Sequence, residues 1–250
     1  MELVPDYSYL GSGLLRIREY GAAAPYLPVG NCSALDLVPQ LNTLQLQDFT
    51  KPGGGIRNRV DRVTDVQFNF TFHDFGGANF ARVLRGTAGA EAAGNVTAET
   101  VVGYKGGWTP LAKYAATITS VEPVGGGTPF TAGTDYELLD GGIFVPSTST
   151  ISAPVAGAAN FEVDYTTAAQ TVTETFVTSA KQYSMIFSGL NEARSGAGVI
   201  VIAHKVSGGV LSTLGLLGED YGGGEVSGSL LADTTKGAGL SQYAKIIMVD

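Results

Sequence analysis

Two histidines and a neighbouring carboxylate are the residues of this chain whose types could hold a metal ion or move a proton. His73 and Asp74 are adjacent, and His204 lies far along the chain. Metal and acid–base sites need several such groups at regular spacing, and no second carboxylate stands at ligand spacing from this pair. Since the chain has only these two histidines, the pattern favours ordinary polar strand residues over a metal or catalytic site.

Glycine-rich segments are the second feature that could carry chemistry. Gly11-Ser-Gly-Leu-Leu-Arg16 begins like a dinucleotide-binding fingerprint, but it lacks the third glycine and the strand–turn–helix setting, so we predict a turn. The glycine triplets at 53–55, 125–127 and 222–224 have no helix after them and predict flexible tips. Neither a Gly-x-Ser-x-Gly elbow nor a Gly-Lys-Ser/Thr phosphate loop occurs. We therefore expect no enzyme activity, catalytic residue, metal or cofactor.

The elements that must position any functional residues are clearest between Asp65 and Phe75. In this run four apolar side chains alternate with four polar ones: Val66, Phe68, Phe70 and Phe72 against Gln67, Asn69, Thr71 and His73. Side chains on a strand point to opposite faces with a period of two. The run therefore predicts a strand with one packed aromatic face and one wet, polar, almost uncharged face.

Composition points to many short strands joined by tight turns. The 250 residues include 35 glycines, and only 15 % are charged, against about 25 % in an average protein. The formal net charge is −8. Proteins that grip nucleic acid through its phosphates need clusters of Lys and Arg, so this charge argues against that class.

Compartment is indicated by cysteine usage and hydropathy. Cys32 is the single cysteine, which excludes an internal disulfide framework and predicts a free buried thiol. The segment from Met1 to Tyr7 has neither a basic stretch nor an apolar core, and no apolar run reaches the length of a membrane span. We expect no secretory signal, no membrane association and a soluble protein made in a cytosol.

The remaining segments predict short strands and one helix. Strands are expected at 14–20, 29–38, 44–48, 114–121, 136–139, 141–145, 160–166, 183–187, 198–206 and 243–249. The stretch from Gly77 to Arg85 predicts the one helix, with Asp74 near its N-cap and Gly86 at the C′ position. The predicted fold is an all-β, antiparallel β-sandwich or partial barrel with one short α-helix. Residues 1–250 are expected to form a single domain, with 87–175 a less typical β-rich elaboration.

A long link from Phe49 to Thr64 joins two alternating segments and contains Pro52-Gly-Gly-Gly55. Links longer than about 12 residues are usually functional or disordered, and this one predicts a hairpin with an extended tip. Its second half is rich in arginine, but Asp61 and Asp65 are interleaved, which favours a protein–protein contact over nucleic acid. The candidate contact residues are Lys51, Arg57, Arg59, Asp61 and Arg62.

Four groups of segments follow one another in a characteristic order. They are 11–17 with 29–37; the hairpin 41–74 with the helix 79–85; 133–145 with 163–166; and 187–191 with 199–206 and 227–233. This order resembles the major tail protein, or tail-tube protein, of long-tailed non-contractile bacteriophages. The resemblance covers most of the chain, and 87–130 fits least well.

The resemblance implies a structural virion protein that is assembled in the host cytoplasm and located in the phage tail. Six copies would form a ring, rings would stack into a tube, and the link at 49–64 would contact the next ring. Its partners would be further copies, other tail proteins and viral DNA that passes through without specific binding. The face lining the lumen would carry Gln45, Gln47, Gln67, Asn69 and Thr71. Such amide and hydroxyl groups offer DNA phosphates no strong partner.

Two other classes of protein share this β-rich composition. One is a different virion component, such as a tail terminator, a decoration protein or a baseplate protein. The other is a carbohydrate-binding β-sandwich module. The chain has one tryptophan, Trp108, and the sequence shows no aromatic partner for it, which argues against this class.

Overall fold

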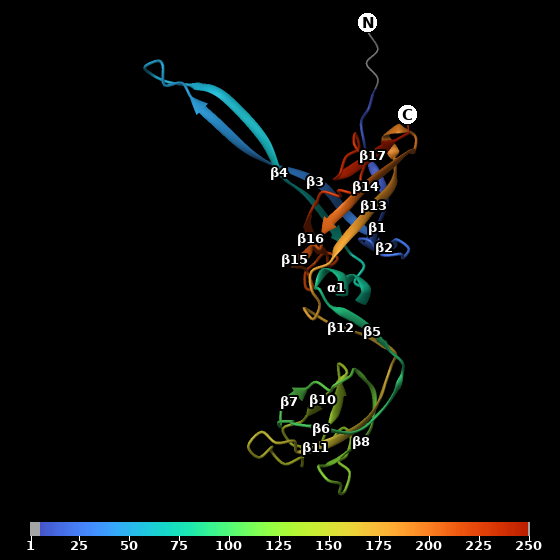
Figure 1. Cartoon of the computed structure of the whole chain (residues 1–250). Coiled ribbons are helices and arrows are strands. Elements are labelled where there is room, and N and C mark those ends of the chain that lie inside the picture. The colour runs from blue at the N-terminus through green and yellow to red at the C-terminus, as the bar shows by residue number, and fades with distance from the viewer. Residues whose placement is uncertain (1–5, 250) are drawn as a thin grey trace. The chain divides into compact units, whose positions relative to one another are not determined.

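A computed structural model describes residues 6–249, which form antiparallel β-sheets with one α-helix and one 3₁₀ turn (Figure 1). This confirms the all-β class, and within the described residues no sheet closes into a barrel. The chain divides into two compact units: unit 1 is Met1–Ala88 with Thr173–Asp250, and unit 2 is Gly89–Val172. No helix in residues 6–249 is long and apolar enough to cross a membrane.

Unit 1 is a sandwich of two sheets. The first has the order β17-β14-β13-β1-β2 and the second the order β15-β16-β4-β3. The first sheet is formed by β1 (Gly11–Glu19), β2 (Leu27–Gly30), β13 (Gln182–Asn191), β14 (Ala197–Ser207) and β17 (Ala244–Met248). The second is formed by β3 (Cys32–Gln47), β4 (Ile56–Phe72), β15 (Val210–Leu214) and β16 (Gly224–Ser229). The 3₁₀ turn η1 (Glu192–Arg194) joins β13 to β14.

The aromatic ridge predicted on β4 lies in the core of this sandwich. Phe68, Phe70 and Phe72 are 1 %, 4 % and 0 % exposed, which confirms their predicted burial. They pack against buried side chains of the first sheet, among them Leu15 and Met185. The apolar and polar residues of β4 therefore alternate because the first sheet covers one face of the strand and leaves the other uncovered.

The helix α1 (Gly77–Val83) is present; Asp74 lies near its N-cap as expected but does not cap it, and the C′ assignment of Gly86 is wrong. Its N-cap is Gly76, which makes no side-chain capping bond, while the Asp74 carboxylate accepts the backbone N–H of Asn31 at 2.9 Å. At the other end Leu84 is the C-cap, and Arg85 rather than Gly86 follows it with a left-handed φ of 50°. The competing donor at Asn31 explains why the carboxylate leaves the helix end uncapped.

Two glycine segments also differ from their predictions because neighbouring atoms crowd them. Gly11 to Gly13 are not a turn but the start of β1, paired with β13, and a Cβ on Gly13 would lie 2.6 Å from the Cα of Gly189. The 222–224 triplet is not a flexible tip, since a Cβ on Gly224 would meet the Phe72 ring at 2.5 Å. In both places glycine permits close packing of strands and rings.

The predicted link at 49–64 is mostly strand. Residues 56–64 continue β4, and its ladder with β3 runs from Cys32 opposite Phe72 to Gln47 opposite Ile56, leaving only a short turn between. We call residues 32–38 with 66–72 the base of this hairpin, and residues 39–65 its arm. Figure 1 shows the arm projecting from the sandwich of unit 1.

Unit 2 is built from two three-stranded sheets. One contains β6 (Gly94–Val101), β8 (Ala115–Pro123) and β11 (Phe161–Thr167), and the other β7 (Gly107–Thr109), β9 (Glu137–Leu139) and β10 (Gly142–Val145). Its own core includes Val121, Ile143 and Phe161, all fully buried. The strands β5 (Thr87–Glu91) and β12 (Gln170–Glu174) pair where the chain passes between units. The expectation of a single domain with an elaboration at 87–175 stays a prediction.

Candidate assembly surface

The histidines are used within unit 1. One ring nitrogen of His73 is 2.9 Å from the carbonyl oxygen of Gly222 and the other is 2.8 Å from the hydroxyl of Ser33, so the ring joins two segments. His204 lies on β14, where burial lowers its pKa. Among residues 6–249 no three His, Cys, Asp or Glu side chains gather closely enough to hold a metal ion.

The single cysteine is free and half-buried in unit 1. Burial, with a smaller contribution from the neighbouring Asp74 carboxylate, raises the pKa of the Cys32 thiol to about 11. A thiol with such a pKa holds little thiolate at neutral pH, so it behaves as a packing residue rather than a nucleophile.

Three of the five candidate lumen residues share the outer face of the second sheet. Gln67, Asn69 and Thr71 are half-buried on β4. Asn69 lies between Asp36 of β3 and Ser227 of β16, whose hydroxyl donates to the Asn69 side-chain oxygen at 2.7 Å. Cross-strand partners lie on the same side of a sheet.

This outer face is more acidic than the residues of β4 alone indicate. The cross-strand register adds two carboxylates from neighbouring strands, Asp36 and Glu225, both exposed. Asp65 of β4 has the parity of Gln67 and accepts the Ser229 hydroxyl at 3.1 Å. No Lys or Arg is found at the face positions of residues 34–40, 65–71 and 225–229. The positions of β4 from Gln67 to Thr71 on this face carry no charge themselves, and the carboxylates come from Asp65 and from the adjacent strands.

The other two candidate lumen residues lie elsewhere. Gln45 and Gln47 belong to the arm, where they stand opposite Arg59 and Ile56. Both are an even number of positions from Leu37, a core-facing residue of β3, and so have its parity rather than that of the polar face. The grouping of all five on one face is wrong. Residues 29–38 and 44–48 were predicted as two separate strands, whereas β3 runs unbroken from Cys32 to Gln47 and so fixes the parity of Gln45 relative to Leu37.

The candidate contact residues lie on the arm and are exposed. Arg59 and Asp61 form an ion pair at 2.9 Å, and the Thr43 hydroxyl donates to Asp61 at 2.6 Å. These hydrogen bonds, from Thr43 first and then Arg59, lower the pKa of the Asp61 carboxyl. In the described part of the chain no salt bridge involves Lys51, Arg57 or Arg62. Their cationic groups are therefore available to a neighbour.

The arm also exposes large apolar side chains that the sequence reading did not single out. Seven of them are between 45 % and 85 % exposed: Leu41, Leu44, Leu46, Phe49, Ile56, Val60 and Val63. Leu44 stands opposite Val60, and Leu41 opposite Val63 with the other parity, so both faces of the arm carry apolar pairs. The leucines were visible in the sequence, but only the structure shows that they lie on an arm on which no other described part of unit 1 packs.

Comparison with known proteins places nearly the whole chain in one family. Residues 8–247 match the profile of a family described as Protein of unknown function UCP028589. The chain belongs to this family. No curated protein matches it. Because the UCP028589 match spans both units and the arm, these features lie within the family's matched region.

Proposed function

We propose that the chain is a structural virion protein, the major tail protein of a long-tailed phage. Hexameric rings of it stack into the tail tube, a conduit for DNA ejection. The observation that carries this proposal is the projecting arm with its seven exposed apolar side chains. Large exposed apolar areas mark interaction sites, and the arm presents apolar side chains on both of its faces. A neighbouring ring would cover it, and Lys51, Arg57 and Arg62 would add charged contacts there.

The sheet edges of unit 1 support self-association. The first sheet ends at β17 and β2, and the second at β15 and β3. Edge strands present unpaired backbone groups that invite another chain. In a ring of copies each second sheet would be continued by that of its neighbour, which removes these edges as barrel closure does.

The acidic outer face of the second sheet suits a lumen. DNA carries about one negative charge per 1.7 Å of its axis. A wall with Asp36, Asp65 and Glu225 among amides and hydroxyls would repel phosphates weakly and bind none. Viral DNA would slide along Gln67, Asn69 and Thr71 without specific binding.

Electron microscopy of the purified chain tests the proposal directly. A tail-tube protein polymerises into long hollow tubes at high concentration, whereas a tail terminator, decoration or baseplate protein gives single rings or monomers. Tubes with a six-fold end view are the expected result. A protein that stays monomeric at every concentration contradicts the proposal.

One observation in unit 2 favours a second candidate, carbohydrate binding. Trp108 and Tyr114 are 47 % and 61 % exposed, and their rings lie against consecutive glycines, Gly142 and Gly141. Exposed aromatic rings on a rigid sheet are surfaces on which sugars stack. A glycan array probed with the native chain and with a Trp108→Ala/Tyr114→Ala variant tests this, since binding that the variant loses would support it.

A further inference from the structure

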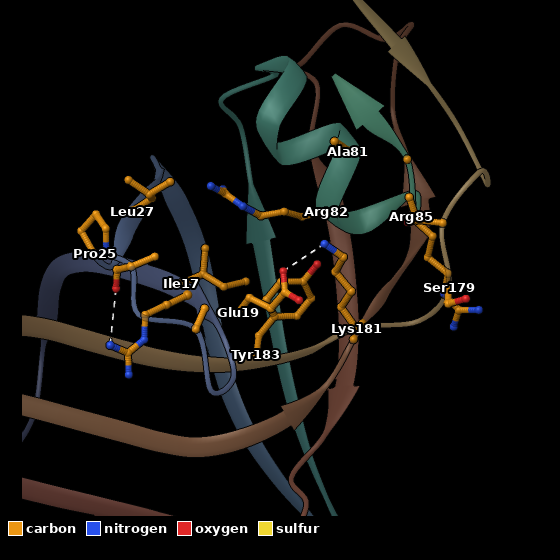
Figure 2. Close-up of a pocket in the computed structure, with 17 residues that line it drawn as sticks. Ile17, Glu19, Pro25, Leu27, Ala81, Arg82, Arg85, Ser179, Lys181 and Tyr183 are labelled. Atoms are coloured by element: carbon orange, nitrogen blue, oxygen red, sulfur yellow. Dashed lines mark hydrogen bonds and ion pairs between the residues drawn. The ribbon is translucent and has the colours of Figure 1, made fainter. Parts of the chain in front are cut away.

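A basic pocket of about 320 Å³ opens in unit 1 beside the end of α1 (Figure 2). Its apolar lining includes Ile17, Pro25 and Leu27. Four cationic side chains also line it, Arg18, Arg82, Arg85 and Lys181, and Glu19 is the one acidic lining residue. The formal charge of the lining is thus 4 − 1 = +3 on a chain of net charge −8.

Two of these cations already have anionic or aromatic partners. The Arg18 guanidinium lies 4.3 Å from the centre of the Tyr26 ring and donates to its hydroxyl at 3.2 Å. Lys181 pairs with Glu19 at 2.9 Å, which raises the pKa of the Lys181 ammonium. Glu19 thus neutralises Lys181, whereas Arg18 has no anion among the described residues and its Nε is buried without a hydrogen-bond partner.

The two arginines of the helix end lack a counter-charge. Arg82 donates to the neutral Asn79 side chain at 2.9 Å, and burial lowers the pKa of its guanidinium. For the Arg85 side chain, no hydrogen bond or ion pair is found with residues 6–249, and its Nε is buried without a partner. A buried charged group is costly unless it is paired, so this edge of the pocket is built to receive an anion.

The arrangement of the two arginines fits an extended segment better than a small anion. Figure 2 shows Arg82 and Arg85 directed away from one another on either side of Lys181. Cations that hold one phosphate converge on a single point. Here they stand along a rim above an apolar wall, which suits a peptide carrying separate acidic and apolar side chains.

The loop between β15 and β16 has this chemistry. Its Leu217 and Tyr221 are 99 % and 96 % exposed, and between them stand Glu219 and Asp220, also exposed. Neither carboxylate has a hydrogen-bond or ion-pair partner within the described residues. The Gly215 N–H donates to the Gly223 carbonyl at 3.0 Å, which closes the loop at its base and presents residues 216–221.

We infer that the basic pocket of one copy receives the 216–221 loop of the next copy. This contact rests on the proposed assembly into rings. Leu217 and Tyr221 pack on the apolar wall, while Glu219 and Asp220 pair with Arg82 and Arg85.

In the structure the pocket and the loop of one copy do not touch, since none of residues 216–221 lines the pocket. Gly208 and Gly209 line the pocket just before β15, and the loop begins just after this five-residue strand. At about 3.3 Å per residue the strand holds them roughly 16 Å apart. A contact between two different surfaces is heterologous, and repetition of it closes a ring or extends a filament.

Charge exchange tests the contact. The pocket-reversed variant is Arg82→Glu/Arg85→Glu, and the loop-reversed variant is Glu219→Lys/Asp220→Lys. Either one alone brings like charges together, so assembly is lost. An equal mixture assembles, because each acidic pocket meets a basic loop and each basic pocket an acidic loop. Glu137→Lys/Asp140→Lys, which makes the same charge change in exposed positions of unit 2, is the control and assembles normally.

Sedimentation velocity and negative-stain microscopy provide the readout, with thermal melting to show that each variant is folded. Where the double pocket variant melts early, Arg85→Glu replaces it, because that side chain has no internal partner to lose. Assembly of either reversed variant alone overturns the contact, and so does a mixture of folded variants that stays monomeric. In both cases wild-type tubes leave the proposed function standing, whereas a monomeric wild type overturns both.

Discussion

The base and the arm of the β3–β4 hairpin are one continuous ladder in two different surroundings. In the base, Phe68, Phe70 and Phe72 are at most 4 % exposed beneath the first sheet. In the arm, Leu44 and Val60 face each other across the same two strands and are 49 % and 45 % exposed. The same secondary structure therefore stabilises the fold in one place and leaves its apolar side chains exposed to solvent in the other.

The largest expected effect is on stability and is confined to the base. Phe70→Ala removes a buried ring and leaves a cavity, so we expect a loss of about 3–5 kcal/mol in the free energy of unfolding. Leu44→Ala in the arm serves as the matched control and should change it by about 0.5 kcal/mol or less. Denaturant unfolding of the two variants measures both. Equal losses would show that the arm packs on the sandwich.

The second expected effect is on assembly and is confined to the arm. Leu44→Ser/Val60→Ser replaces an exposed apolar pair by hydroxyls, so the monomer should melt at the wild-type temperature while tubes fail to form. Negative-stain microscopy and melting curves on the same preparation provide the test. Wild-type tubes from this variant would remove the arm from the inter-ring contact.

A third effect separates the polar face of the base from the arm. Gln67→Lys should leave the fold intact, since the position is only half-buried, and in the proposed ring of six copies it would add six cations to the proposed DNA path. Phosphate attraction would then slow DNA ejection in a salt-dependent way. Gln45→Lys, on the arm, makes the same charge change with the opposite parity. The test is the DNA ejection rate of virions that carry either variant and have normal tails. Equal rates for the two variants would show that Gln67 does not face the lumen.

The smallest expected effect is on pH dependence. Hydrogen bonds from Thr235 and then Tyr20 lower the pKa of the buried Asp233 carboxyl to about 2, from an ordinary value of 3.8. A lowered pKa gives stability that is complete above about pH 4 and is lost as pH falls towards 2. Asp233→Asn should therefore flatten the melting temperature between pH 4 and pH 2.

Asp61 on the arm is the matched carboxylate for this experiment. Its pKa is also lowered, by Thr43 and Arg59, but its side chain is 42 % exposed and solvent screens it. Asp61→Asn should leave the acid part of the melting profile unchanged. A larger change from Asp61→Asn than from Asp233→Asn would contradict the difference in burial between the two regions.

The contrast also explains what the sequence could predict. Residues 66–72 were predicted to be strand because their apolar and polar residues alternate. The alternation arises because one face of the segment is buried and requires an apolar residue at every second position. Residues 56–64 of the same strand were predicted to be a link. Neither face of this segment is covered, so charged residues such as Arg57, Arg59 and Arg62 are tolerated on both faces. On the same arm the alternating Leu44 to Gln47 was predicted to be strand although Leu44 and Leu46 are exposed, so an uncovered strand can carry a period-two signal but need not do so.

The candidate surfaces were harder to predict because they depend on strand register and on segments far apart in the chain. Asp36 and Glu225 join Asn69 on one face only through pairing of three strands. Gln45 was assigned to that face because residues 29–38 and 44–48 were predicted as two strands, while they are one continuous strand, β3. Arg82 and Arg85 are three residues apart on the chain, but their pocket also needs Arg18 and Lys181, which the fold brings from far away.

The place where the chain leaves and rejoins unit 1 has a consequence for protein engineering. β5 and β12 are paired there, and the N–H groups of Phe176 and Thr178 donate to the carbonyls of Leu84 and Arg85 at 2.8 and 2.9 Å. The two ends of residues 89–172 are thus held side by side by a ribbon. A short turn from Ala88 to Thr173 could replace the whole segment, and an enzyme or epitope whose own termini are adjacent could be grafted in its place. A chain that forms tubes would then display that cargo once per subunit, at a fixed repeat along the tube.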